Sequence, residues 1–542
     1  MKLSILLESV TEIRRVSIVK EGMQHQHSAG TWQHNNLQDY EIGSIHYRAQ
    51  EVKPAGLFVA VKGFKADGHD FIDEALARGA SVIVTQEPVN KKSVIIEVEN
   101  TRRALAAISA NFYGNASEKL FIIGITGTNG KTTTAYIIES ILAEAGFKVG
   151  VIGTINYRYS GMVFPNPMTT PESLDLQRIL AEMHENGITH VVLEVSSHAI
   201  DLHRIDCCRI DIGVFTNLTR EHLDYHGNMD SYWFCKKRLF TEHLKTGPRK
   251  GRTLAVVNCD DKRGKRLYNL LSEASDSMPV ISTGSTADKM IWPDNIKYGL
   301  TGITGRISTK RGIFNFKSPL AGKHNLENIL SATGVGIALG LSPAIIKAGI
   351  EKAGRIPGRL ELIPNKAGKF VFVDYAHTPD ALGHVLSSLK SIKDNEIGRI
   401  ICVVGCGGDR DRGKRPLMGE IAGRFCDLTI ITSDNPRTED PMGIISRIVE
   451  GIKQTSSKEY TLPELANGIQ EKGYVIEPDR RKAIKLGITS AGPGDIILIA
   501  GKGHETYQLI GGETFHFDDR DEAREVLKND NGKQTKNTLD YC

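Results

Sequence analysis

The first part of the chain alternates short apolar runs with amphipathic segments. Runs at Leu57 to Val61, Val82 to Val84 and Val94 to Val98 have the length of buried strands, and Phe71 to Arg78 has a helical pattern. This alternation predicts a small α/β domain. A polar stretch from His25 to Asn36 interrupts the pattern, and we expect it to form a loop.

A second block begins with an apolar strand at Leu120 to Ile123, which runs directly into glycines. Apolar positions in Thr132 to Ala145 then recur at helical spacing, and the glycine that follows is a suitable cap. Buried strands are predicted further on, at Val191 to Leu193, Ile212 to Phe215 and Leu254 to Val257. Because strands alternate with helices, the sheet should be mainly parallel.

A third block begins near Pro357 and has the same alternating character. Its predicted strands are Phe370 to Val373, Ile400 to Val404, Leu428 to Thr432 and Ile496 to Ala500. Each strand ends in a polar loop rich in glycine or aspartate. Ligands of open α/β sheets bind beside the carboxyl ends of the strands, so these loops are the expected site.

Length and composition agree with a multidomain enzyme. The 542 residues suggest three or four domains, and the pattern favours three, at 1–118, 119–356 and 357–542. Glycine is in excess, with 54 residues, and it lacks the period of collagen, so it belongs in turns and ligand-cradling loops.

Charge and apolar content narrow the class of protein. A net charge of +4 over this length does not indicate a nucleic-acid partner. No run of 18 apolar residues exists, and the amino-terminal apolar run is too short for a signal peptide, so we expect no membrane association. The eight cysteines form no CxxC pair, which is typical of reduced thiols in a cytoplasmic protein.

The most specific motif lies at Gly124 to Thr133 and reads GITGTNGKTT. A strand precedes it and a helix follows it, as in a phosphate-binding loop. Backbone N–H groups of such a loop surround phosphate oxygens, and the helix amino terminus adds partial positive charge. Lys131 would reach the β- and γ-phosphates and the Thr132 hydroxyl would bind Mg²⁺. The first glycine comes one residue earlier than in the usual spacing.

Two further polar residues follow strands of the central block. Glu194 ends one strand, where a second Mg²⁺ ligand is expected, and His222 follows another strand and could hold a second cation. Taken alone, the first could be an ordinary strand-end carboxylate and the second a surface imidazole.

Three loops of the third block follow strands and carry charge. They are GCGGDRDRGKR from Gly405, DNPR from Asp434 and GKGHE from Gly501. Basic, flexible loops suit an anionic ligand, and Arg437 offers a planar fork for a carboxylate. Three such loops on one sheet indicate a converging pocket more readily than three unrelated turns.

Taken together, these motifs resemble those of the Mur ligases, which use ATP to form amide bonds during peptidoglycan synthesis. GTNGKTT is the phosphate loop that this family shares with folylpolyglutamate synthases. The similarity extends over nearly the whole chain. It is most specific for the branch of the family that adds the third residue of the stem peptide. It is carried by TTP at 169, EVSSH at 194, HLDYHG at 222, GKHNLEN at 322, PGR at 357, DYAHTPD at 374, GCGGDRD at 405, DNPR at 434 and AGKGHE at 500.

The resemblance implies a fold of three α/β domains. The amino-terminal domain would bind the UDP-linked substrate, the central P-loop domain would have a mainly parallel sheet, and the carboxyl-terminal domain would be Rossmann-like. The reaction implied is ATP-dependent addition of meso-diaminopimelate to the D-glutamate of UDP-N-acetylmuramoyl-L-alanyl-D-glutamate, with ATP and Mg²⁺ required. The family suggests a cytoplasmic monomer.

The resemblance also implies residue roles. The ATP contacts would be Thr128, Asn129, Gly130, Lys131, Thr132, Thr133, Thr134, Asn328 and Arg359. The contacts to the UDP-linked dipeptide would be Thr169, Thr170, Ser196 and Arg204. The diaminopimelate pocket would comprise Arg410, Asp434, Asn435, Pro436, Arg437, Gly501 and Glu505. Lys131, Lys236, Glu194 and His222 would be the catalytic set, and Thr132, Glu194, His222 and Lys236 the metal ligands.

The lysine of the family motif AKxxLF is carbamylated and helps to hold magnesium. Here that stretch reads Phe234-Cys-Lys236-Lys-Arg-Leu239-Phe240, and Lys236 has the matching register. A carbamate converts a cation into an anion, which explains how a lysine could lie beside Mg²⁺.

The chemistry of the proposed diaminopimelate pocket is coherent. The distal centre of this amino acid carries a carboxylate, which Arg410 and Arg437 can pair, and an ammonium, which Asp434 and Glu505 can pair. Lysine lacks the distal carboxylate and would leave the arginines unpaired. DNPR is the version of the motif associated with diaminopimelate in this family.

Two motifs depart from the family pattern. Its amino-terminal YDSR-x-V reads Tyr47-Arg-Ala49-Gln50-Glu-Val52 here, and a glutamine common before the His-Arg pair is Leu202. Alternatives therefore stay open at this stage. They are lysine as the amino acid, a sister Mur ligase, a folylpolyglutamate-synthase-like ligase, a P-loop ATPase that drives conformational change, and a non-catalytic binding protein.

Overall fold

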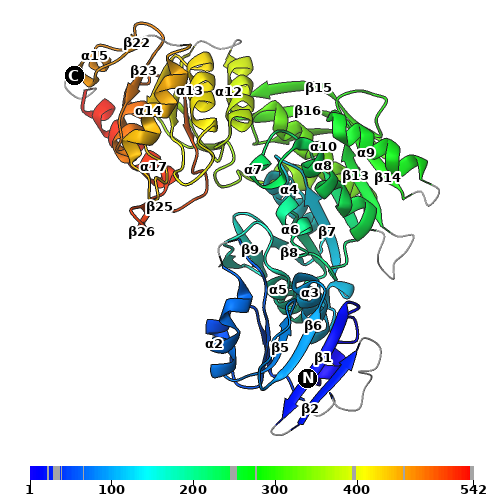
Figure 1. Ribbon diagram of the computed structural model, residues 1–542. Coiled ribbons are helices and arrows are strands. Elements are labelled where there is room, and N and C mark those ends of the chain that lie inside the picture. Colours follow the sequence, from blue (N-terminus) through cyan, green and yellow to red (C-terminus); the bar gives the residue numbers. More distant parts are fainter. Residues whose placement is uncertain are drawn as a thin grey trace.

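The computed structural model describes residues 1–20, 23–28, 37, 40–64, 66–244, 253–274, 278–393, 398–455 and 458–537. Three α/β domains follow one another along the chain, each built around its own large sheet (Figure 1). The first and third domains lie at the two ends of an elongated molecule, with the central domain between them. The predicted fold class is confirmed.

The first domain has six strands in the order β2-β1-β6-β5-β4-β3. Strands β3 to β6 are parallel, and β1 pairs antiparallel with both β6 and β2. The strands are β1 (Ile13–Lys20), β2 (Met23–Ser28), β3 (Ser44–His46), β4 (Gly56–Val59), β5 (Ala80–Thr85) and β6 (Val94–Val98), and the helices are α1 (Leu3–Leu6), α2 (Ile72–Ala77) and α3 (Thr101–Phe112).

One prediction in this domain is wrong in part. The polar stretch from His25 was expected to be a loop, but His25 to Ser28 belong to β2, which pairs with β1 from Arg15 to Lys20. The strand was missed because its side chains are polar at every position after Met23, so no apolar period marks it. The remainder of that stretch lies outside the described residues.

The central domain has eleven strands in the order β10-β9-β8-β11-β7-β12-β13-β14-β15-β16-β17. The middle of this sheet, from β8 to β14, is parallel, as predicted. Those strands are β7 (Phe121–Thr126), β8 (Val149–Ile152), β11 (His190–Glu194), β12 (Ile212–Phe215), β13 (Leu254–Asn258) and β14 (Val280–Thr283). Apolar clusters lie on both of its faces, which explains the continuous apolar runs.

Both edges of the central sheet are antiparallel, which the sequence did not predict. One edge is the hairpin β9 (Asn156–Tyr159) and β10 (Met162–Pro165), and the other is β15 (Ile291–Gly299), β16 (Gly302–Thr309) and β17 (Gly312–Ser318). The helices of this domain are α4 (Lys131–Glu144), α5 (Ser173–Glu185), α6 (Ser197–Asp201), α7 (Leu223–His226), α8 (Met229–Arg238), α9 (Lys262–Glu273), α10 (Lys323–Ala338) and α11 (Pro343–Lys352).

The third domain has seven strands in the order β18-β19-β24-β20-β21-β23-β22, parallel except for β18. They are β18 (Glu361–Ile363), β19 (Phe370–Asp374), β20 (Ile400–Val404), β21 (Leu428–Ile431), β22 (Lys458–Glu459), β23 (Gly473–Ile476) and β24 (Ile496–Ala500). A hairpin, β25 (Tyr507–Ile510) and β26 (Glu513–His516), projects from one side of this domain (Figure 1). The helices are α12 (Pro379–Lys393), α13 (Lys414–Phe425), α14 (Pro441–Ile452), α15 (Leu462–Ala466), α16 (Arg480–Thr489) and α17 (Asp519–Asn537).

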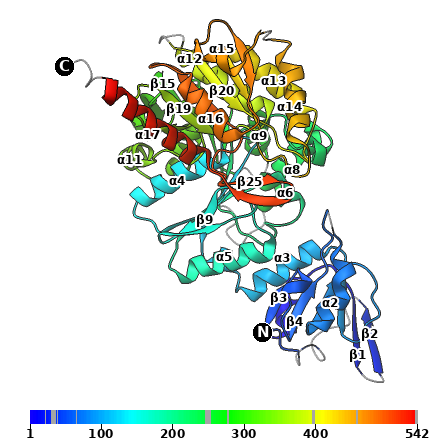
Figure 2. The ribbon, with the colours of Figure 1, turned by 90° about the vertical axis from the view of Figure 1, so that its left-hand side faces the viewer.

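The domains meet through few elements. Helix α3 of the first domain packs on α5 of the central domain, and Leu174 of α5 joins the apolar core of the first domain (Figure 2). Leu300 and Ala321 of the central domain join a core cluster of the third. The predicted boundaries at 118 and 356 fall in connections between the three sheets and stay predictions. Within the described part of the chain, no helix has both the length and the apolar character that a membrane crossing needs.

Candidate functional site

The phosphate loop connects β7 to α4 in the middle of the central sheet. Gly127 has φ +151°, and a Cβ atom there would lie 1.9 Å from the Thr216 Oγ1 atom. Gly130 is the N-cap of α4 with φ +87°, and its Cβ would lie 2.2 Å from the Asn328 Oδ1 atom. Both positions therefore require glycine, because a side chain would be strained and would collide with neighbours. The predicted loop is confirmed in its geometry.

Two lysine side chains converge on one carbonyl of this loop. The Lys131 Nζ donates to the carbonyls of Gly127 and Thr128, each at 2.9 Å, and the Lys236 Nζ donates to the Gly127 carbonyl at 2.8 Å. Lys236 is almost fully buried. Burial lowers the pKa of both amines, and the charge of Lys131 lowers that of Lys236 further. The two amines thus lie together beside the amino terminus of α4, whose partial positive charge favours an anion.

A hydroxyl and a carboxylate that could bind a metal ion lie close to these lysines. The Thr132 Oγ1 donates to the Glu194 Oε2 atom at 2.9 Å, at the end of β11. Thr154 holds the same carboxylate with its backbone N–H, at 3.0 Å, and with its hydroxyl, at 2.9 Å. Arg359, from the start of the third domain, donates to the Thr132 Oγ1 atom at 3.3 Å. Thr132 is therefore a point at which the central and third domains meet.

His222 lies next to Glu221, an acidic residue for which the sequence predicted no role, and several basic side chains surround the pair. Its Nε2 atom is 3.7 Å from the Glu221 Oε2 atom. Burial alone would raise the pKa of Glu221, but His222, His377 and the two lysines hold it below its ordinary value. Among the hydrogen bonds of the described residues, one joins Thr132 to Glu194 and none joins His222 to either of them, and the predicted metal set stays a prediction.

A cavity of about 300 Å³ lies between the phosphate loop and the third domain. Asn129, Gly130, Thr133 and Asn328 line it from the central domain, while Asp374, Tyr375 and His377 line it from the third. Asn328 is buried and accepts a hydrogen bond from the Thr134 hydroxyl at 3.3 Å. Both domains thus contribute walls to a single cavity that adjoins the phosphate loop.

The four residues predicted to contact the UDP-linked dipeptide lie around Glu194 and Glu172. The Thr169 and Thr154 hydroxyls are 3.1 Å apart, and the Thr170 hydroxyl donates to the Glu194 carbonyl at 2.8 Å. The same hydroxyl accepts from the backbone N–H of Ser196 at 3.1 Å.

Arg204 faces the junction with the first domain. Its Nε atom is 2.9 Å from the Glu172 Oε1 atom, and its NH1 donates to the Thr170 carbonyl at 3.2 Å. Arg102 of α3 pairs with the same Glu172 carboxylate at 3.3 Å. Two arginines therefore share one carboxylate, and the cluster keeps a net positive charge toward the predicted substrate.

The departures from the family motif lie beside this junction. Ala49 is buried in a short 3₁₀ helix, Gln50 is exposed, and Leu202 is half-buried after α6. The Tyr47 hydroxyl donates to the Asp175 Oδ2 atom at 2.8 Å and so ties this segment to α5. Nothing in the structure explains the loss of the family residues at the three positions.

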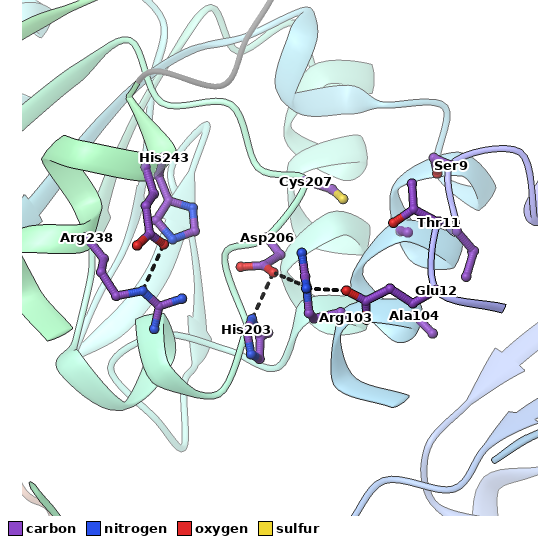
Figure 3. Close-up of a pocket in the computed structure, with 13 residues that line it drawn as sticks. Ser9, Thr11, Glu12, Arg103, Ala104, His203, Asp206, Cys207, Arg238 and His243 are labelled. Atoms are coloured by element: carbon purple, nitrogen blue, oxygen red, sulfur yellow. Dashed lines mark hydrogen bonds and ion pairs between the residues drawn. The ribbon is translucent and has the colours of Figure 1, made fainter. Parts of the chain in front are cut away.

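A second cavity, of about 440 Å³, lies at the same junction and is lined by none of the predicted site residues (Figure 3). Arg103 of α3 extends between Glu12 and Asp206, forming an ion pair with Glu12 and lying 3.8 Å from the Asp206 carboxylate. The His203 Nδ1 atom is 2.9 Å from that carboxylate. The residues that line this cavity come from the first and the central domain, so it is part of their junction.

Four of the residues predicted for the amino-acid pocket lie together at the ends of β21 and β24. The Asn435 Nδ2 donates to the Glu505 Oε2 atom at 2.9 Å. Gly501 has φ +115°, and its Cβ would lie 3.1 Å from the Asp434 Oδ2 atom. The Asp434 Oδ1 atom is buried and has no hydrogen-bond partner within the described structure. An acceptor thus remains available for a ligand.

The two arginines of the pocket both lie close to Gly407. A Cβ at Gly407 would be 2.9 Å from the Arg437 NH1 atom and 3.9 Å from the Arg410 Cγ atom. Arg437 has φ +54° and donates from NH1 to the Gly408 carbonyl at 2.7 Å. Pro436 lies against Gly408, whose Cβ would be 1.9 Å from its carbonyl oxygen. Arg437 is thereby held against the loop, whereas Arg410 is exposed.

Sequence reasoning missed Lys502 and Arg480, which support this pocket. Lys502 is fully buried, with its Nζ 3.2 Å from the Glu505 Oε2 atom. Arg480 is paired with Asp519 at 2.6 Å, both side chains fully buried, and donates to the Ala500 carbonyl at 3.0 Å. Lys502 stands inside the AGKGHE motif, so its position was a signal, whereas nothing local marks Arg480.

A strand, a glycine loop and a helix of this geometry define a protein of the P-loop class. Three family models match the chain, described as "Mur ligase family, catalytic domain" over residues 41–113, "Mur ligase middle domain" over 125–336 and "Mur ligase, glutamate ligase domain" over 358–503. The chain belongs to the Mur ligase family.

Relatives and a solved structure extend this similarity to the full length. The UDP-N-acetylmuramoyl-L-alanyl-D-glutamate–2,6-diaminopimelate ligase of Geobacter metallireducens is 48% identical, with 90% of this chain and 94% of the relative covered. The ligase of the same name from Geobacter sulfurreducens is 48% identical, with 89% and 94% covered. A solved structure of a ligase of that name is 30% identical, with a TM-score of 0.64 and 92% and 97% covered.

Proposed function

We propose that the protein is an ATP-dependent ligase that joins meso-diaminopimelate to the D-glutamate carboxylate of UDP-N-acetylmuramoyl-L-alanyl-D-glutamate. The observation that carries the proposal is the placement of the phosphate loop beside a cavity walled by the third domain, whose strand ends hold paired acids and arginines. Relatives 48% identical over nearly their whole length bear the name of this ligase.

The nucleotide would lie in the cavity beside the loop. Its phosphates would accept from backbone N–H groups of Thr128 to Thr134 and from Lys131, whose ammonium would turn from the loop carbonyls toward them. Asn328 would approach the nucleoside part and Arg359 the phosphates. Because Arg359 belongs to the third domain, bound nucleotide would draw the two domains together.

Magnesium fits the donors found here. The Thr132 hydroxyl and the Glu194 carboxylate are hard oxygen ligands 2.9 Å apart, of the kind Mg²⁺ prefers. His222 and Lys236 would complete the set, Lys236 as a carbamate. When bound, Mg²⁺ neutralises negative charge on the phosphates. The lowered pKa of Lys236, caused first by burial, leaves more of its amine neutral and able to react with carbon dioxide.

The reaction would proceed in two displacements. An oxygen of the D-glutamate carboxylate attacks the γ-phosphorus, the bond to ADP breaks, and an acyl phosphate forms. The neutral amine of diaminopimelate then attacks the acyl carbon and loses a proton, and phosphate leaves as the tetrahedral intermediate collapses. Lys131 and Arg359 would stabilise the phosphate charge, so the protein contributes mainly positioning and electrostatics.

The choice of amino acid would rest on the third-domain loops. Arg437, fixed by its bond to the Gly408 carbonyl, and Arg410 would pair the distal carboxylate of diaminopimelate. Asp434, whose Oδ1 atom accepts no hydrogen bond within the described structure and lies 3.6 Å from the Lys502 Nζ atom, and Glu505 would accept from the distal ammonium. Lysine would leave both arginines without an anion, and a site built for a polar group rejects analogues that lack it.

The UDP-linked dipeptide would occupy the junction of the first and central domains. Arg204, Thr169, Thr170 and Ser196 gather there around Glu194, so the acceptor carboxylate would arrive beside the γ-phosphate. We further propose that the protein acts as a monomer, as the family resemblance suggests. We place the reaction in the cytoplasm, where ATP is available.

The test is a substrate-dependence assay of the purified protein. It is incubated with ATP, Mg²⁺ and UDP-N-acetylmuramoyl-L-alanyl-D-glutamate, with diaminopimelate or lysine in separate reactions, and phosphate and the ligated product are measured. We expect both products with diaminopimelate and little with lysine. Equal use of the two amino acids would overturn the specificity. Phosphate release that ignores the UDP-linked substrate would indicate an ATPase of another kind.

A further inference from the structure

Lys502 occupies the centre of the amino-acid pocket although no role was predicted for it. Its side chain is fully buried, and its Nζ atom lies 3.0 Å from the Asn435 Oδ1 atom, 3.2 Å from the Glu505 Oε2 atom and 3.6 Å from the Asp434 Oδ1 atom. A buried lysine is rare unless it is paired. This one faces both of the acids that were predicted to receive the substrate ammonium.

The charges around Lys502 can be counted. Two carboxylates and one ammonium leave one net negative charge on this side of the pocket. One further ammonium neutralises it, and the buried Asp434 Oδ1 atom still has a free acceptor position. Without Lys502, the buried carboxylate of Asp434 and the half-buried carboxylate of Glu505 would share a single substrate cation, and a buried charge without compensation is costly.

The hydrogen bonds of Asn435 show how Lys502 also fixes geometry. The Asn435 Oδ1 atom accepts from Lys502 and from the Leu509 N–H, at 3.0 Å each, while its Nδ2 donates to Glu505 at 2.9 Å. Lys502 itself follows Gly501, whose φ of +115° turns the chain at the end of β24. The lysine therefore joins the loops after β21 and β24 into one rigid unit.

We propose that Lys502 is a positioning residue of this pocket, which holds Asp434, Asn435 and Glu505 in place and sets the pocket to accept one substrate ammonium. The proposal rests on the function proposed above. It assigns Lys502 no contact with the reacting atoms, and its effect is exerted through the two carboxylates.

A consequence for pH follows from the groups that face Glu505. Burial raises the pKa of this carboxyl, and Asp434 raises it too, while Lys502 and the amide of Asn435 lower it. After burial, the charge of Glu505 raises the pKa of the Tyr375 and Tyr507 phenols, and after Asp519 it raises that of Arg480. Arg437 and Arg410 lower the pKa of Tyr507. Lys502 is the nearest cation to Glu505 within the described structure.

This arrangement of charges determines how the KM for diaminopimelate should depend on pH when Lys502 is replaced. Loss of the Lys502 charge should raise the pKa of Glu505 further, so that this carboxyl takes up a proton at a higher pH than in the intact pocket. A protonated carboxyl no longer pairs with an ammonium. The KM for diaminopimelate of a Lys502 variant should therefore fall as pH rises from about 6 to about 9, whereas the intact pocket should change less.

The experiment compares Lys502→Met and Lys502→Gln with Lys482→Met. Gln keeps a donor without charge, and Lys482 is a matched control because its side chain is 70% exposed on α16 of the same domain. We expect the two Lys502 variants to raise the KM for diaminopimelate at pH 7 by about tenfold to 100-fold, with the KM for ATP within about twofold of wild type. The control should resemble wild type at every pH.

The double variant Lys502→Met/Glu505→Gln identifies the titrating group. Its KM for diaminopimelate should be high and independent of pH, because Gln does not ionise. A Lys502→Gln enzyme whose pH profile parallels that of Lys482→Met would overturn the proposal, and this readout remains if Lys502→Met fails to fold. A wild-type protein without diaminopimelate-dependent phosphate release would instead refute the proposed function itself.

Discussion

The replacement Gly130→Ala tests whether the phosphate loop holds the nucleotide in the way its geometry requires. The new methyl group would lie 2.2 Å from the Asn328 Oδ1 atom, so the Asn328 side chain would have to move by more than 1 Å (roughly, to reach van der Waals contact). Movement breaks the hydrogen bonds that Asn328 makes with Thr134, at 3.3 Å, and Asn325, at 3.1 Å. Nucleotide affinity should fall as a result.

A matched glycine separates the effect of the collision with Asn328 on nucleotide affinity from the effect of the backbone strain. Gly146 has φ +82°, close to the +87° of Gly130, but a Cβ there meets nothing within 4 Å. Both substitutions share a backbone penalty of about 1–2 kcal/mol. Only Gly130→Ala loses two buried hydrogen bonds, worth about 0.5–1.5 kcal/mol each. Together they predict nucleotide binding weaker by about 5-fold to 150-fold than in Gly146→Ala.

The assay is titration of each variant with a fluorescent ATP analogue, with thermal unfolding recorded in parallel. Adding Asn328→Gly to Gly130→Ala removes the collision and should recover part of the steric loss, although the contacts of Asn328 are lost too. Equal nucleotide affinity in Gly130→Ala and Gly146→Ala would refute the reasoning, because it would mean that Asn328 is not held against the loop.

Three other substitutions give independent tests. Arg437→Ala should raise the KM for diaminopimelate far more than that for ATP, because Arg437 is fixed by the Gly408 carbonyl at 2.7 Å; equal rises in steady-state assays would remove it from the pocket. Arg480→Met leaves Asp519 buried without its partner and should lower the free energy of unfolding of the third domain by about 3–5 kcal/mol, measured by urea unfolding with a probe in that domain. The double variant Arg480→Met/Asp519→Leu should recover most of that loss. Lys236 should form a carbamate, seen as a ¹³C-bicarbonate-derived NMR signal that Lys236→Met abolishes. Because burial, and then the charge of Lys131, lower the pKa of this amine, more of it is neutral than in an exposed lysine, and the signal should fade as pH falls and protonates it. An unchanged signal in Lys236→Met would assign the carbamate to another amine.

The parts of the fold that the sequence predicted are those marked by local patterns. Strand β12 was predicted with its observed limits, since a buried parallel strand reads as a continuous apolar run. The phosphate loop was predicted because the strand, glycines and helix stand together in the chain. Strands β16 and β17 were missed, because at the sheet edge apolar and polar side chains alternate or mix and no long apolar run forms.

The candidate site follows the same division. Residues in the motifs at strand ends were predicted, and the structure places Asp434, Asn435 and Glu505 together. Glu221 and Lys502 were missed because their importance comes from burial and from neighbours that the fold brings close. Lys131 and His377 act on Glu221 from other segments of the chain, and Asn435 lies 67 residues before Lys502. A charged residue next to a motif looks like any solvated side chain until its surroundings are known.

The contact of Arg359 with Thr132 has a thermodynamic consequence. The nucleotide cavity has walls from two domains, and the amino-acid pocket belongs to one of them. If diaminopimelate binds the two orientations of the third domain with different affinity, a nucleotide that favours one orientation changes the affinity for diaminopimelate, and diaminopimelate changes the affinity for nucleotide by the same factor. The two substrates would then be linked through the orientation of a domain, and the order in which they bind would alter their apparent affinities but not the free energy of the full complex.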